Sequence, residues 1–164
     1  MYAAFKKDRK VAGSAKFDLV GDVDDDFNPE RVALHDKDLV VFGSQFKSGT
    51  GYTYLTLPFD KASDITSLSM REVTGDKKFD ILVRGVLHSK APKEAGGGDV
   101  DREVELVYRV VGGQLKRVFA AEVGRSMGGK RVTAQIRYQP GKIVVTPGEA
   151  KGWTEKDYPF NQDT

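Results

Sequence analysis

The segment DVDDDFNPE, residues 22–30, guides the prediction of the fold, because it runs directly into the largely apolar segment RVAL, residues 31–34. A related segment, EVTGDKKFD at residues 72–80, lies fifty positions later and runs into ILVR at residues 81–84. Both segments place oxygen-bearing side chains at the first, third, fifth and ninth positions, a spacing that lets a loop wrap around a hard cation. The recurrence predicts a modular β architecture in which an acidic loop introduces each leading strand.

Turn residues divide the rest of the chain into short segments rich in β-branched and aromatic residues. Gly112-Gly113, Gly128-Gly129 and Pro140-Gly141 mark three tight turns. Besides the strands after the acidic loops, we expect strands at residues 39–42, 52–57, 65–73, 103–111, 114–121, 131–138 and 143–146. Residues 120–127 fit either one helical turn or a bulged strand end. The pattern predicts an all-β fold, an antiparallel meander of about eight to ten strands. This meander would form a sandwich, an open barrel or a partial propeller-like sheet, with little helix.

The chain has 164 residues, enough for one domain with a substantial core, and we expect a single β domain over residues 1–164. A closed propeller needs at least about four blades, for which the chain is too short. The expected parts are repeat-like units at about 18–60 and 65–123, a flexible loop at 89–100, a hairpin at about 130–147 and an aromatic tail at 151–160. Within this tail, Trp153 is expected to dock on the domain.

The two acidic loops and the strands after them resemble the FG-GAP and VCBS-type repeats of integrin-like β-propellers and many secreted bacterial proteins. The resemblance covers roughly a third of the chain. It implies a calcium site in the first loop and a second, weaker site in the other loop. The implied ligands are Asp22, Asp24, Asp26 and Glu30 in the first loop, and Glu72, Thr74, Asp76 and Asp80 in the second. The resemblance also implies an extracellular or periplasmic location.

The same loops also allow an interpretation without metal. Calcium loops of this kind have glycine at the sixth position, where this chain has Phe27 and Lys77, and Lys77-Lys78 adds positive charge. Asp and Asn side chains cap turns through backbone amides, so the loops could keep the turn while Phe27 and Phe79 fill the core. Mutual repulsion among the carboxylates of residues 24–26, which a cation would relieve, favours the metal.

Composition and charge limit the possible functions. Hydrophobic residues make up 39% and charged residues 30% of the chain, as in ordinary globular proteins, and the absence of cysteine excludes disulfides and thiol catalysis. No apolar run approaches the ~20 residues of a membrane-spanning helix, and the first ten residues lack the apolar stretch of a signal peptide. The net charge is only +2, but bases concentrate late in the chain. A candidate nucleic-acid surface comprises Lys116, Arg117, Arg125, Lys130, Arg131, Arg137 and Lys142.

No catalytic motif emerges, so we do not expect an enzyme. His35 and His88 lack a nucleophile in a suitable sequence context and are interpreted as solvent-facing. Glu103 and Glu105 lie two apart on one strand face, which leaves a carbohydrate-processing enzyme as the weakest alternative.

We predict a non-catalytic binding or scaffold module of a bacterial envelope or secreted protein, with one calcium-stabilised acidic loop and a protein or glycan partner. The alternative is a cytosolic β-domain that binds single-stranded nucleic acid through its basic region, residues 116–142.

Overall fold

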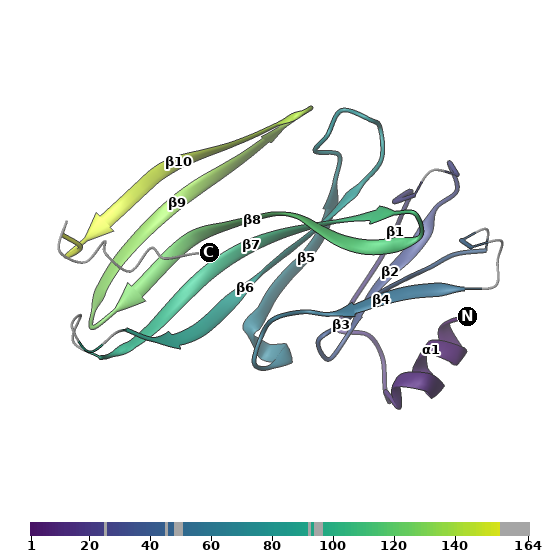
Figure 1. Cartoon of the computed structure of the whole chain (residues 1–164), viewed down its shortest axis with the longest axis horizontal. Coiled ribbons are helices and arrows are strands. Elements are labelled where there is room, and N and C mark those ends of the chain that lie inside the picture. Colours follow the sequence, from purple (N-terminus) through teal and green to yellow (C-terminus); the bar gives the residue numbers. More distant parts are fainter. Residues whose placement is uncertain (25, 45, 48–50, 92, 94–96, 155–164) are drawn as a thin grey trace.

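The computed structural model describes residues 1–24, 26–44, 46–47, 51–91, 93 and 97–154. Ten strands in this part of the chain form two antiparallel sheets, which confirms the predicted all-β fold (Figure 1). The first sheet has the order β1-β2-β3-β4 and consists of Phe17–Gly21, Glu30–His35, Asp38–Phe42 and Tyr52–Thr56. The second has the order β10-β9-β8-β7-β6-β5 and consists of Lys142–Lys151, Lys130–Gln139, Gln114–Met127, Asp99–Val111, Asp80–Lys90 and Ile65–Arg71. A short 3₁₀ helix, Ala62–Asp64, precedes β5.

The main core lies between the two sheets. Alternate residues of β2 and β3, such as Val32 and Val41, pack with alternate residues of β6 and β7, such as Ile81 and Leu106. These side chains are almost completely buried, as the period of two in an antiparallel strand requires for the face that packs on another layer.

The second sheet curls because β9 pairs with β8 only over four residues, where Gly124–Met127 face Lys130–Thr133. Beyond these pairs, the β9–β10 hairpin lies over the other face of the sheet, where Tyr138 packs beside Leu82. At the tip of the hairpin, Gly141 donates its backbone N–H to the carbonyl oxygen of Val73 at 2.9 Å. The hairpin tip therefore lies beside the loop that joins β5 to β6, at the top of Figure 1.

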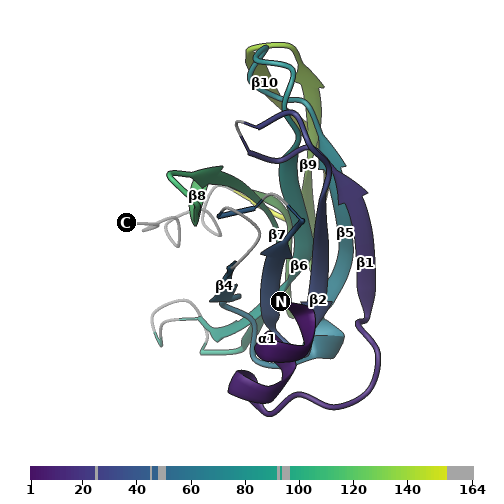
Figure 2. The same ribbon diagram turned by 90° about the vertical axis from the view of Figure 1, so that its right-hand side faces the viewer.

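The helix α1, Tyr2–Arg9, is an element that the sequence analysis did not predict. Its Phe5 is completely buried against Ala33 and Val40, on the outer face of the first sheet (Figure 2). The same helix covers His35, which is only 2% exposed and hydrogen-bonds the hydroxyl of Tyr2. The expectation that His35 faces solvent was therefore wrong.

The structure also decides the sequence predictions for the end of β8, for Trp153 and for the loop between β6 and β7. Residues 120–127 are the bulged end of β8, not a helical turn. Trp153 is 9% exposed and packs with Val100 and Met127, which confirms that it docks, whereas residues 155–160 of the expected tail lie outside the described residues. Strands β6 and β7 extend into both ends of the expected flexible loop, of which residues 92 and 94–96 lie outside the described residues. Over the described ranges, no helix is long and apolar enough to cross a membrane.

Candidate metal centre

The two acidic loops occupy equivalent places in two similar hairpins. The first joins β1 to β2 and is closed by the pair Gly21 and Glu30, and the second joins β5 to β6 and is closed by Arg71 and Asp80. The loops lie side by side, because Phe79 donates its N–H to the carbonyl oxygen of Asp22 at 2.9 Å.

The backbone at the sixth position of each loop is left-handed. Phe27 has φ of 61° and Lys77 has φ of 69°. This is the conformation that glycine adopts without steric cost. Both loops therefore make the sharp turn of a cation-binding loop even though neither has glycine there.

The ninth residue of each loop braces the loop from inside. Glu30 and Asp80 have no exposed surface, and each accepts a hydrogen bond from the backbone N–H of the second loop residue. Val23 donates to Glu30 Oε2 at 3.1 Å, and Val73 donates to Asp80 Oδ2 at 3.2 Å. Two buried carboxylates are thus fixed at corresponding positions.

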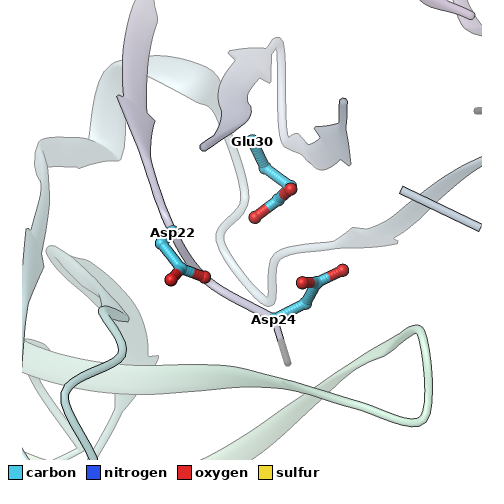
Figure 3. A group of neighbouring side chains, drawn as sticks. All are labelled: Asp22, Asp24 and Glu30. Atoms are coloured by element: carbon cyan, nitrogen blue, oxygen red, sulfur yellow. The ribbon is translucent and has the colours of Figure 1, made fainter. Parts of the chain in front are cut away.

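Three of the four ligands expected in the first loop come together. One carboxylate oxygen from each of Asp22, Asp24 and Glu30 lies within 4.8 Å of the other two. Figure 3 shows the three side chains around a common space, with Glu30 reaching in from the start of β2. Asp26 is not a member of this group. Its Oδ1 accepts the N–H of Asn28 at 2.7 Å, which is the turn chemistry of the interpretation without metal.

The first loop holds buried carboxylate oxygens that accept no hydrogen bond from the described residues. They are Oδ1 of Asp22 and Oε1 of Glu30. Burial and, to a smaller extent, the neighbouring aspartates together raise the pKa of Glu30 to about 7, against the opposing effect of the Val23 N–H. The pKa of Asp24 is also raised, mainly by burial. A cation among these groups would satisfy the orphaned oxygens and relieve the repulsion.

The second loop contains a positive charge supplied by the protein. Arg109 of β7 donates from Nε to Asp80 Oδ1 at 2.9 Å, and its terminal nitrogen lies 3.2 Å from Asp76 Oδ2 and hydrogen-bonds Thr74. Three of the four residues expected to bind metal in this loop therefore surround a guanidinium group. The fourth, Glu72, accepts the N–H of Gly75 in the same loop.

The strand register explains why only one loop has this arginine. In the pairing of β6 with β7, Ile81 faces Tyr108, so the next position places Arg109 opposite Asp80. In the pairing of β2 with β3, Arg31 faces Phe42, so the next position places Gly43 opposite Glu30. A Cβ atom on Gly43 would lie 3.1 Å from Glu30 Oε1. The position that supplies the cation in the second loop has no side chain in the first.

The two loop phenylalanines do not fill the core as the interpretation without metal expected. Phe27 is 86% exposed and Phe79 is 40% exposed. The left-handed turn at residue 27 places that side chain in solvent at the tip of the loop. The second residue of each loop, Val23 or Val73, is buried instead.

The basic residues of the nucleic-acid alternative are spread over three strands. Arg125 is buried against Glu122, and Arg131 is paired with Glu103. The remaining members lie on β8, β9 and β10: Lys116, Arg117, Lys130, Arg137 and Lys142. Nucleic-acid binding stays a prediction.

The two carboxylates considered for a carbohydrate-processing enzyme each form an ion pair with an arginine. Glu103 pairs with Arg131, and Glu105 pairs with Arg84 and also accepts a hydrogen bond from the hydroxyl of Tyr138.

His88 is half-exposed and lies between Asp101 and Asp64, which raise its pKa.

Comparison with protein-family models, with curated proteins and with solved structures finds no match to this chain.

Proposed function

We propose that this chain is a non-catalytic binding or scaffold module of an envelope or secreted protein, in which the first acidic loop binds one calcium ion. Asp22, Asp24 and Glu30 would supply the protein ligands. The second loop would bind no ion, because Arg109 takes that role. The scaffold role and the location rest on the resemblance of the two loops to secreted β-repeat proteins.

The contrast between the loops is the observation that carries the metal proposal. Both have a buried ninth-position carboxylate that is braced by the same backbone hydrogen bond. In the second loop a guanidinium compensates that charge, whereas in the first loop Oδ1 of Asp22 and Oε1 of Glu30 have no partner among the residues that the structure describes. Because buried polar atoms are nearly always satisfied, the first loop has the properties of a cation site.

The ligand atoms favour calcium over other common cations. All three side chains offer carboxylate oxygen, which hard cations prefer, and the described part of the chain offers no histidine to the group. Calcium accepts six to eight oxygen ligands in flexible geometry, so carboxylates, loop carbonyls and water can share its coordination. Magnesium demands a stricter octahedron, so we expect it to bind more weakly.

Calcium titration of the chelator-treated protein, followed by calorimetry and by thermal unfolding, tests this proposal. At a calcium concentration about a hundredfold above Kd, mass action would stabilise the fold by about 2.7 kcal/mol. For a domain of this size, that raises Tm by about 5–10 °C. We expect one ion per chain and a much smaller effect from magnesium.

Two matched variants locate the ion. Asp22→Asn alters the first position of the first loop, and Glu72→Gln alters the first position of the second. The proposal requires that Asp22→Asn abolish the calcium response and that Glu72→Gln retain it. Equal calcium responses in both variants, or none in the unaltered protein, would show that the first loop holds no ion.

A further inference from the structure

A second candidate site lies on the other side of the curled sheet, where a cavity of about 530 Å³ separates β9 from β5, β6 and β7. The cavity exists because β9 leaves β8 after four paired residues and continues over the sheet. The hydrogen bond from the N–H of Gly141 to the carbonyl oxygen of Val73 fixes the tip of the β9–β10 hairpin at the other end of β9. The volume falls in the range of about 300–1,000 Å³ that small-molecule sites occupy.

Positive charge predominates in the lining. Arg71 of β5, Arg84 of β6 and Arg137 of β9 line the cavity, against the single carboxylate of Glu105 on β7. Side chains alternate along a strand, and Tyr138 of β9 reaches Glu105, so the side chain of Arg137 lies on the opposite face of β9. Arg71 and Arg84 therefore supply the guanidinium groups of the cavity, and two of them against one carboxylate attract anions.

The single carboxylate is already neutralised by the protein. Glu105 is only 5% exposed, and Arg84 donates from Nε to its Oε2 at 2.9 Å. Its other oxygen accepts the hydroxyl of Tyr138, which crosses from β9. Glu105 thus holds Arg84 and Tyr138 in place, and little of its charge is left to repel an anionic ligand.

Arg71 is available to a ligand. Within the described ranges, it forms no ion pair with a carboxylate. The guanidinium carbon of Arg71 lies 5.6 Å from the centre of the Tyr138 ring. Because Glu105 fixes this ring, the ring in turn restricts where the Arg71 guanidinium lies.

The rest of the lining offers hydroxyl groups and an apolar surface. Ser67 and Ser69 of β5 lie in the cavity beside Arg71, and neither hydroxyl is used within the described protein. Leu82, at the same site, and the ring of Tyr138 supply apolar contact. A body with both hydroxyl groups and apolar faces, such as a sugar ring, suits this combination.

We propose that this cavity binds an acidic monosaccharide, whose carboxylate or phosphate group is held by Arg71. Planar guanidinium groups bind both kinds of oxyanion by paired hydrogen bonds, so the two share one recognition chemistry. Ser67 and Ser69 contact the ring hydroxyls. The inference rests on the proposed binding function, for which it names a class of ligand, but it does not depend on calcium.

Calorimetric titration of the chelator-treated protein at low ionic strength tests the site. The probes are glucuronate for the carboxylate, glucose 6-phosphate for the phosphate, and glucose and inorganic phosphate as the separate halves. We expect at least one of the two sugar acids to bind saturably and at least about tenfold more tightly than glucose or inorganic phosphate. The tighter of the two identifies the oxyanion that the site prefers.

Arginine-to-glutamine variants, each of which removes one positive charge, distinguish binding in the cavity from non-specific electrostatic attraction of the anion. Arg71→Gln should weaken binding of the preferred sugar acid by about tenfold or more. Arg117→Gln removes an exposed arginine of β8 that does not line the cavity, and it should change the affinity less than about twofold. Unfolding curves establish that each variant is folded.

Two results would overturn the inference. One is that folded, unaltered protein binds neither sugar acid more tightly than inorganic phosphate. The other is that Arg117→Gln weakens binding as much as Arg71→Gln does. A normal calcium titration on the same sample, combined with either result, leaves the metal proposal intact and removes only the sugar-acid site.

Discussion

The buried carboxyl group of Glu30 predicts that the calcium-free protein loses stability as the pH rises from about 5 to about 8. Its pKa is about 7 in the folded protein, compared with an ordinary value of 4.5. The folded state therefore holds this proton more tightly than the unfolded state does. The contribution of Glu30 to stability is fully present below about 4.5 and is lost as the pH rises through about 7.

The size of the effect follows from the difference between the two pKa values. From 4.5 to about 7, at about 1.4 kcal/mol per pKa unit, the loss is at most about 3 kcal/mol. In a domain of 164 residues, this corresponds to a decrease in Tm of about 6–12 °C. Calcium binds the ionised form, so the stabilisation by calcium should grow over the same interval of pH.

The variant Glu30→Gln isolates this group. Glutamine keeps an acceptor for the Val23 N–H but carries no charge, so the pH-dependent loss and the calcium response should both disappear. Other groups titrate nearby: the pKa of Asp24 is raised and that of His35 is lowered, both mainly by burial. Because these groups remain in the variant, the difference between the two stability profiles reports Glu30 together with its coupling to the neighbouring aspartates.

The measurement is urea unfolding of both proteins at about pH 5, 6, 7 and 8, with chelator and with excess calcium. In chelator, the unaltered protein should approach or fall below the variant in stability as the pH rises. Parallel profiles at all four values would show that Glu30 is ionised normally in the folded protein, and the electrostatic argument for the metal would fail.

Two further predictions concern Arg109 and the left-handed residue at the sixth position of each loop. Arg109→Ala leaves the buried carboxylate of Asp80 uncompensated, so the free energy of unfolding in urea should fall by about 3–5 kcal/mol. Calcium should partly restore the stability of this variant. A decrease of less than about 1 kcal/mol would contradict the assigned ion pair. Phe27→Gly relieves a left-handed backbone at an 86% exposed side chain and should stabilise the protein by about 0.5–1 kcal/mol. Lys77→Gly, at φ of 69° in the second loop, should stabilise the protein by a similar amount. If both glycine variants are less stable than the unaltered protein, the backbone at these two positions is not strained.

The sequence was sufficient to predict the fold class because its turn chemistry and alternation are local signals. The Gly112-Gly113 and Gly128-Gly129 turns connect antiparallel neighbours, as two-residue glycine turns require. The helix α1 was not predicted, because Phe5 is its sole buried residue and most of its other side chains are polar. The burial of His35 follows from that helix and was missed with it.

The grouping of the first loop could be predicted from spacing, but the state of the second loop could not. Asp22, Asp24 and Glu30 are near one another in sequence, and the turn brings them together. Arg109 is 29 residues from Asp80, and their contact depends on the register between β6 and β7. A register cannot be read from composition or from a local motif. The cavity beside β9 was missed for the same reason, since it depends on where a hairpin leaves its neighbour.

The identity of the ninth residue and that of the residue opposite it are linked. Aspartate at position 80 is short and leaves room for the guanidinium of Arg109. Glutamate at position 30 is one methylene longer, and its Cγ and Oε1 lie 3.2 and 3.1 Å from where a Cβ of residue 43 would be. A side chain at residue 43 would therefore require Glu30 to shift, whereas glycine leaves Glu30 in place. With glycine opposite it, Glu30 meets no internal cation from that position, and its Oε1 lies in the group that Asp22 and Asp24 also form.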